Sequence, residues 1–146
     1  MRDVYINKIA AFLPNEAVDN ETIEKVLGQI GHRESRAKRI ILRSNKIKTR
    51  YYAIDPKTRK STHTNAQLTA IAIKKLESDG LDLNSVEVLA CGTTMSDQLM
   101  PNHALMVHGE VGMKPLEVIA TAGICLSGIT SLKYAYNSIK SGDSDV

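Results

Sequence analysis

The sequence contains no tryptophan, a single phenylalanine and only two cysteines in 146 residues. Cys91 and Cys125 stand far apart, and neither belongs to a Cys-x-x-Cys pair or to another spacing used by zinc sites. His103 and His108 differ by five positions, so they do not share one face of a helix as residues four apart would. These absences argue against a disulfide scaffold and against a metal site.

Strong charge of one sign and long apolar runs are also missing. A net charge of +3 does not require a nucleic-acid partner, and Tyr51 and Tyr52 offer little base stacking among the basic residues. No run approaches the roughly 18 apolar residues of a membrane span, and the first residues include Asp3 and Pro14 where a signal peptide needs an apolar run. We expect a folded cytoplasmic protein without membrane insertion.

Hydrophobic periodicity alternates between the strand and helix types along the chain. Residues 32–60 interrupt this order with many basic residues, and we expect them to form an exposed connector or flap. The alternation predicts an α/β fold whose sheet is covered on both faces, and the chain stops where another strand is due, which indicates half of a larger unit. The predicted elements are a strand over 4–14, a helix over 19–31, a helix over 62–80, a strand over 85–94, a helix over 101–112, a strand over 115–123 and a helix over 125–142.

Apolar residues at helical spacing predict which faces of two helices are buried. The inner stripe of the helix over 62–80 is expected to consist of Leu68, Ile71, Ala72 and Leu76, and that of the helix over 125–142 of Leu126, Ile129, Leu132, Tyr136 and Ile139.

Cys125 follows an apolar strand and begins a helix, where backbone N–H groups lack intrahelical partners and the helix dipole is positive. Such a position can lower a thiol pKa from about 8.5 by a unit or more, which favours the nucleophilic thiolate. Small neighbours such as Gly123 and Gly128 leave room for a bound acyl group. A backbone N–H beside the sulfur could donate a hydrogen bond to an oxyanion that forms during the reaction. The alternative is that Cys125 is a small buried hydrophobe, which we expect for Cys91 inside its apolar strand.

Residues 117–145, "EVIATAGICLSGITSLKYAYNSIKSGDSD", place Cys125, Gly128 and a Lys-Ser-Gly ending after an apolar strand. This stretch resembles the nucleophile segment of the thiolase-like condensing enzymes, particularly the β-ketoacyl-ACP synthase III group. Three upstream stretches resemble the same family in the right order, and together the four cover nearly all of residues 3–145. These stretches are "INKIAAFLPNEAVDNETIEK", "IKTRYYA" and "EVLACGTTMSDQLMPNHA".

The resemblance implies a layered thiolase-like fold of two duplicated halves, of which this chain would be the first. It implies a homodimer without a tightly bound cofactor, with acyl-CoA or acyl-ACP and malonyl-ACP as substrates. The Cys, here Cys125, would accept an acyl group, and a decarboxylated malonyl unit would attack it in a Claisen condensation serving fatty acid, lipid or polyketide synthesis. A supporting His and Asn belong to the second half of the family fold, so neither His103 nor His108 is assigned that role.

Departures from the family pattern concern the substrate. The family often has a Trp at the mouth of its CoA tunnel, which this chain lacks, and Ile124 and Leu126 flank the nucleophile where alanines are common. The usual Gly before Ile47 is also absent. These differences indicate a divergent member with its own acyl pocket.

A basic cluster is the candidate site for an acidic acyl carrier protein or for pantetheine phosphates, and a solvated flap is the alternative. Lys48 and Arg50 are favoured because they lie in a stretch that resembles the family. Thr94 and Met100 lie in the loop after a strand, a usual place for ligand contacts in α/β sheets, and simple packing of the loop is the alternative. The resemblance implies that this loop lies at the dimer interface, with Met100 reaching the partner's acyl pocket. The cluster consists of Arg33, Arg36, Lys38, Arg39, Arg43, Lys46, Lys48 and Arg50.

Two hypotheses from other classes stay open at this point. The chain could be a non-catalytic thiolase-like subunit or fragment that binds acyl carrier protein or a dimer partner. It could also be an unrelated α/β domain in which Cys125 is a redox-sensing thiol.

Overall fold

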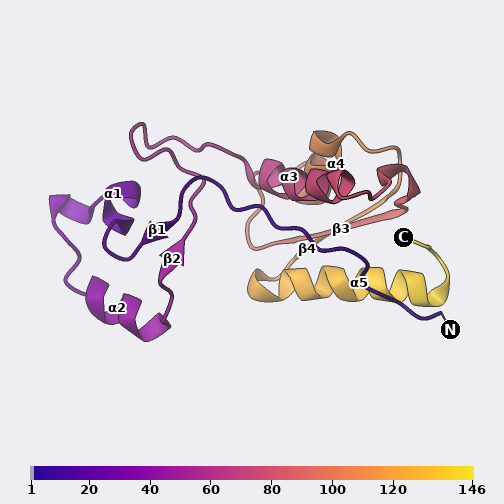
Figure 1. Ribbon diagram of the computed structural model, residues 1–146, viewed down its shortest axis with the longest axis horizontal. Helices are drawn as coiled ribbons and strands as arrows, with labels where there is room; N and C mark the ends of the chain where they lie inside the picture. Colours follow the sequence, from indigo (N-terminus) through magenta and orange to yellow (C-terminus); the bar gives the residue numbers. More distant parts are fainter. Residues whose placement is uncertain (1) are drawn as a thin grey trace. The chain divides into compact units, whose positions relative to one another are not determined.

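The computed structural model describes residues 2–146, which form two compact units. The smaller unit is Leu13–Thr64, and the larger unit combines the residues up to Phe12 with Asn65–Val146. Figure 1 shows the course of the chain through both.

The larger unit is built on a parallel pair of strands, β3 (Val88–Thr93) and β4 (Glu117–Ala122). Helices α3 (Asn65–Ser78) and α4 (His103–Val111) cover one face of the pair, and α5 (Ser127–Ser141) covers the other (Figure 1). Two adjacent parallel strands need a long crossover connection between them, and α4 lies in that connection. Strands that are covered on both faces are expected to have nearly continuous apolar sequences, as β3 and β4 do. The predicted α/β order of this part is therefore confirmed.

The core of the larger unit lies between the strand pair and helices α3 and α4. Val107 is fully buried there, and Leu89 and Cys91 reach the same cluster from alternate positions of β3. Burial raises the pKa of the Cys91 thiol to about 11, because the thiolate would lose its solvation. The expectation that Cys91 is a core residue is confirmed.

The smaller unit contains short elements joined by side-chain hydrogen bonds. Its elements are β1 (Val18–Asp19), α1 (Ile23–Leu27), a 3-10 turn (Ile30–His32), α2 (Lys38–Asn45) and β2 (Thr49–Arg50), with β1 and β2 antiparallel. The Arg50 guanidinium donates to Asn20 Oδ1 at 2.8 Å, and the Lys38 ammonium lies 3.4 Å from the Glu24 carboxylate. The segment 32–60, expected to be a connector or flap, thus contributes a helix and a strand, although most of its side chains remain exposed.

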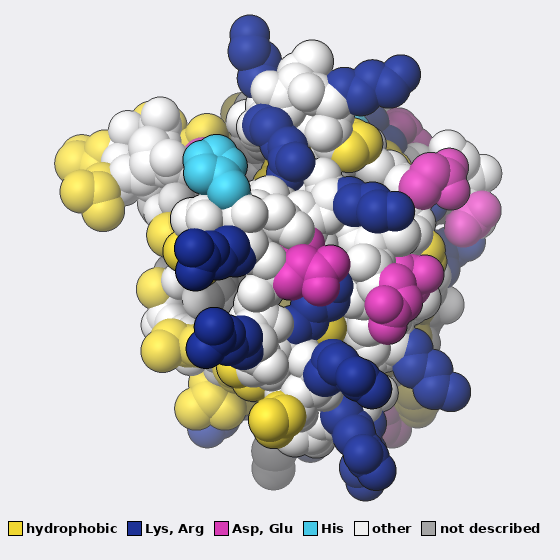
Figure 2. Space-filling view, turned by 90° about the vertical axis from the view of Figure 1, so that its left-hand side faces the viewer, with side chains coloured by type: hydrophobic (Ala, Val, Ile, Leu, Met, Phe, Trp, Pro, Cys, Tyr) yellow, Lys and Arg dark blue, Asp and Glu magenta, His cyan; other side chains and the backbone are white. Residues whose placement is uncertain are grey.

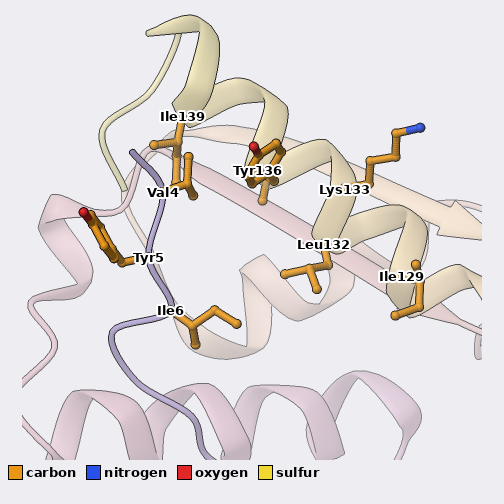
Figure 3. Close-up of a pocket in the computed structure, with 9 residues that line it drawn as sticks. Val4, Tyr5, Ile6, Ile129, Leu132, Lys133, Tyr136 and Ile139 are labelled. Atoms are coloured by element: carbon orange, nitrogen blue, oxygen red, sulfur yellow. The ribbon is translucent and has the colours of Figure 1, made fainter. Parts of the chain in front are cut away.

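The predicted strand over 4–14 is wrong. No described residue in 2–14 belongs to a strand, because a strand needs a hydrogen-bonded neighbour and this segment lies beside a helix instead. Val4, Tyr5 and Ile6 line an apolar hollow of about 540 Å³ together with Ile129 and Tyr136 of α5 (Figure 3). Further along the segment, Lys75 Nζ of α3 donates to the Ala11 carbonyl at 2.9 Å.

The predicted buried faces of two helices are also corrected. In α5 the buried residues are Ser127, Ser131 and Ser138, whereas Ile129 is 64% and Leu132 is 53% exposed. In α3 the buried residues are Ala66 and Ala70, and the expected stripe of Leu68, Ile71, Ala72 and Leu76 is half-buried. Small side chains let α5 approach the strands closely and let α3 approach α4, so the larger apolar side chains lie to the side or on the outer surface. The outer face of α5, formed by Ile129, Leu132 and Tyr136, borders the hollow lined by Val4, Tyr5 and Ile6 and remains largely exposed.

Candidate functional site

The candidate site lies at the turn that joins β4 to α5. β4 ends at Ala122, a 3-10 turn occupies Ile124–Leu126, and α5 begins at Ser127, so Cys125 lies directly before a long helix. The helix ends at Gly142, whose φ of 90° suits a glycine C-cap. The strand-to-helix position predicted for Cys125 is confirmed, with the helix beginning two residues later than expected.

Cys125 is exposed, unlike Cys91. The preceding residue, Ile124, has a φ of 50°, which is unfavourable for a β-branched side chain and rarely adopted by one. Strain of this kind persists only where the surroundings hold it, and it gathers at functional turns. The turn therefore presents the sulfur of Cys125 to solvent rather than to the core.

Hydrogen bonds on both sides hold the turn. The Ile124 carbonyl accepts from the Ser127 hydroxyl at 2.9 Å and from the Thr94 hydroxyl at 3.4 Å, and the Gly123 carbonyl accepts from the Leu126 N–H at 3.0 Å. Thr94 was predicted as a site residue, and the structure brings it to the turn that carries Cys125. The loop after β3 and the turn after β4 thus meet at the carboxyl ends of adjacent parallel strands, where α/β folds usually bind ligands.

The first turn of α5 is fixed against β3 by a close backbone approach. A Cβ atom at Gly92 would lie 2.5 Å from the Ser127 carbonyl carbon and 2.7 Å from the Gly128 nitrogen, so only glycine fits. On the other side, the Thr121 hydroxyl of β4 lies 2.8 Å from both the Ser127 carbonyl oxygen and the Ser131 hydroxyl oxygen. The sequence pattern placed Gly92 within the strand over 85–94 and did not identify it as a packing residue.

The remaining predicted site residues fall in different surroundings. Gly128 is exposed in the first turn of α5, three residues after Cys125, and has open space where a Cβ would lie. Met100 is exposed in the loop between β3 and α4, and its carbonyl accepts from the Gln98 amide at 3.0 Å. Lys48 and Arg50 belong to the smaller unit, where Lys48 is exposed and Arg50 is half-buried against Asn20. The ligand roles of these residues stay predictions.

Sequence reasoning missed two polar groups near the loop after β3. The Asp97 carboxylate accepts the N–H groups of Asn65 at 2.8 Å and Ala66 at 3.0 Å, so it caps the start of α3. His103, the first residue of α4, is buried, and its Nδ1 has no hydrogen-bond partner among residues 2–146. The Pro-Asn pair before His103 is a recognisable helix-start signal, but nothing in the sequence shows how deeply His103 is buried.

Within residues 2–146, no three His, Cys, Asp or Glu side chains gather in a group suited to a metal ion. The same residues contain no helix that combines the length and the apolar character needed to cross a membrane. The compartment of the protein stays a prediction.

Comparison with known proteins finds curated relatives that are named β-ketoacyl-[acyl-carrier-protein] synthase III. No family model matches the chain. It is 27% identical over 142 residues to a β-ketoacyl-[acyl-carrier-protein] synthase III of Ehrlichia canis, which covers 97% of this chain and 41% of the relative. It is 25% identical over 138 residues to the enzyme of the same name from Chlorobaculum tepidum, covering 94% of this chain and 39% of the relative.

Solved structures agree with this relationship. A tetronic acid condensing enzyme superposes with a TM-score of 0.72 and 25% identity over 89% of this chain and 39% of its own. The β-ketoacyl-[acyl-carrier-protein] synthase III of Thermus thermophilus superposes with a TM-score of 0.70 at 20% identity, over 93% of this chain and 38% of its own, which shows the fold. The chain spans about two fifths of the length of the curated relatives it matches.

Proposed function

Because this chain is related to the β-ketoacyl-ACP synthase III-like condensing enzymes and has one half of their thiolase-like fold, we propose that Cys125 carries an acyl group in a carbon–carbon condensation. The observation that supports this proposal most directly is the position of Cys125. It is exposed on a strained turn between a parallel strand and a long helix. The helix start favours an anionic oxygen that develops close to it.

The proposed reaction has two steps. In the first, the Cys125 sulfur attacks the carbonyl carbon of an acyl thioester, and the donor thiol leaves with the proton of the cysteine. In the second, malonyl-ACP loses CO₂, and the resulting carbanion attacks the carbonyl carbon of the acyl-cysteine. A carbon–carbon bond forms, the carbon–sulfur bond to Cys125 breaks, and a β-ketoacyl-ACP is released.

Particular residues support the first step in this proposal. Thr94 and Ser127 fix the turn through the Ile124 carbonyl, and Gly92 and Thr121 fix the start of α5, so the sulfur is held in place before substrate arrives. Gly128 leaves open space one helical turn beyond Cys125 for the acyl group. We propose acyl-CoA or acyl-ACP as donors, a homodimer as the working assembly and no tightly bound cofactor.

The supporting His and Asn are not assigned in this chain, so we propose that a second thiolase-like half supplies them and covers the outer face of α5. Side chains as large and as exposed as Ile129, Leu132 and Tyr136 form an apolar face of the kind that marks an interface.

The test is intact-protein and peptide mass spectrometry after incubation with acetyl-CoA. We expect a mass increase of one acetyl group that maps to Cys125, that is lost in Cys125→Ser and that is retained in Cys91→Ala. The first step alone is measured, because decarboxylation needs groups outside this chain. If Cys125 stays unmodified even when a longer form with the second half is used, the proposal is wrong.

A non-catalytic role remains the second candidate, since the smaller unit is strongly basic and could bind an acidic carrier protein without chemistry at Cys125. This role predicts carrier binding that is unchanged in Cys125→Ser, together with no acyl adduct on any residue.

A further inference from the structure

Helix α2 of the smaller unit exposes two neighbouring isoleucines that neither the proposed reaction nor the core uses. Ile40 is 74% and Ile41 is 57% exposed, whereas Leu42 is half-buried. Residues two positions apart lie on nearly opposite sides of a helix, so Ile40 points away from the side that Leu42 buries. Single exposed apolar residues are common on protein surfaces, but adjacent large ones on one helix indicate an interaction surface.

Basic side chains flank these isoleucines. Arg39 and Arg43 lie one helical turn apart, and both are exposed. Residues 32–50 contain eight lysines and arginines and a single acid, Glu34, which gives this segment a formal charge of +7. Figure 2 shows hydrophobic side chains exposed between Lys and Arg side chains on one face of the molecule. A helix that combines exposed apolar and basic side chains is typical of contact with a negatively charged surface.

The Glu24 carboxylate contacts α2 from another side. The Lys38 ammonium lies 3.4 Å from this carboxylate, and it donates to the Glu21 carbonyl oxygen at 3.4 Å. Lys38 precedes Ile40 by two positions, so these contacts lie on nearly the opposite side of the helix from Ile40. An anionic surface that approaches Ile40 therefore does not meet the Glu24 carboxylate.

The two isoleucines project from the surface, and the hollow beside them does not include them. A folded protein partner needs a groove to receive projecting side chains, whereas the surface of a lipid bilayer takes up aliphatic side chains among its headgroups without one. Anionic headgroups also complement the arginines, because each basic residue close to such a surface adds to binding. The hollow has a volume of about 630 Å³ and is lined by Glu21, Glu34, Ser35, Arg36, Lys38 and Arg39.

We propose that α2 binds the surface of an anionic membrane. Ile40 and Ile41 enter the headgroup region, and Arg39 and Arg43 contact the lipid phosphates. This is a contact with the membrane surface and involves no helix that crosses the bilayer. The surface is separate from the Cys125 turn, so the inference goes beyond the proposed function and does not rest on it.

The first test is sedimentation of the chain with vesicles of phosphatidylcholine alone or of phosphatidylcholine mixed with phosphatidylglycerol. We expect binding to the mixed vesicles to be about tenfold tighter or more, and to weaken as salt screens the charges. Ile40→Gln should weaken this binding several-fold, and glutamine is a good helix former, so α2 should still form. The control is Ile9→Gln, at an isoleucine of the larger unit that is 83% exposed, which should leave binding unchanged.

The second test uses tryptophan fluorescence, because the chain contains no tryptophan of its own. In the Ile40→Trp variant, addition of the mixed vesicles should shift the emission to shorter wavelength, and brominated lipid in those vesicles should quench it. The Ile9→Trp variant should show neither change. The two readings together report whether α2 itself enters the headgroup region.

Equal binding to the two kinds of vesicle, or no binding to either, would overturn the inference. Unchanged binding of Ile40→Gln would overturn it as well, because charge alone would then attract the chain to the vesicles. An emission shift of the Ile40→Trp variant with an acyl carrier protein but not with the mixed vesicles would identify a protein as the partner of α2 and reject the membrane.

Discussion

At the scale of single residues, Gly92 decides how closely α5 approaches the strand pair. A methyl group there would lie 2.5 Å from the Ser127 backbone, and neither β3 nor the first turn of α5 can yield without breaking other bonds. We therefore expect Gly92→Ala to lower the free energy of unfolding by about 3 kcal/mol or more and to reduce acylation of Cys125. Urea unfolding and the acetyl-CoA assay measure the two effects.

The matched control is Gly109→Ala in the middle of α4. Nothing lies within 4 Å of a Cβ at this position, and alanine is the better helix former. We expect Gly109→Ala to raise the free energy of unfolding by up to about 1 kcal/mol. Equal stability of the two variants would show that the contact between Gly92 and Ser127 is not tight.

The pH dependence of the stability of the fold tests whether the Cys91 thiol is buried. Its pKa is raised to about 11 from an ordinary 9.0, so above pH 9 the thiol ionises in the unfolded chain and stays protonated in the fold. The folded state then binds the extra proton, and its stability is full below pH 9 and declines as pH rises toward 11, by roughly 2 to 3 kcal/mol in total. Unfolding measured at pH 8 and pH 10.5 should show this decline in the parent chain and a smaller decline in Cys91→Ala. Identical declines would mean that the Cys91 thiol is not protected from solvent.

At the scale of elements, α5 presents small polar residues to the strands and large apolar residues outward. Ser131 is buried and shares a 2.8 Å hydrogen bond with Thr121, whereas Leu132 is more than half exposed. We expect Ser131→Leu to destabilise this chain by about 2 to 3 kcal/mol through overpacking and loss of the hydrogen bond, and Leu132→Gln to change its stability by less than about 0.5 kcal/mol. Thermal unfolding of the two variants decides which face of the helix is inner. If Leu132→Gln is the more damaging change, α5 packs on the strands through its apolar face instead of through its serines.

The same elements show what the sequence could predict. Hydrophobic periodicity, together with glycine or asparagine at the element ends, predicted helices α3, α4 and α5 and strands β3 and β4. These elements were predictable because the local sequence determines where they start and stop. The prediction of the buried faces of α3 and α5 was wrong because hydrophobic periodicity identifies the apolar face of a helix but not the neighbour that covers it. The strand over 4–14 was wrong because a strand depends on a neighbour that the local sequence does not contain. Cys125 was identified from its place between a strand and a helix. The burial of His103 and the packing of Gly92 against α5 depend on parts of the chain that only folding brings together.

At the scale of the whole molecule, charge is unevenly divided between the two units. The smaller unit contains twelve of the 19 lysines and arginines and six of the 16 acids, a formal charge of +6, and the larger unit carries −3. Figure 2 shows Lys and Arg side chains spread over one face of the molecule, with fewer Asp and Glu among them. A carrier protein with an acidic surface would be attracted to the smaller unit rather than to the chain as a whole.

This division predicts that carrier binding depends on salt and on position. Lys48 is exposed in the smaller unit, and Lys114 is exposed in the larger one, so Lys48→Glu and Lys114→Glu change the net charge equally. We expect Lys48→Glu to weaken binding of an acyl carrier protein several-fold at low salt and Lys114→Glu to weaken it much less, with both differences fading as salt screens the charges. Titration calorimetry at two salt concentrations measures this. Equal losses in the two variants would show that net charge alone attracts the carrier, and a loss confined to Lys114→Glu would place the carrier on the larger unit instead.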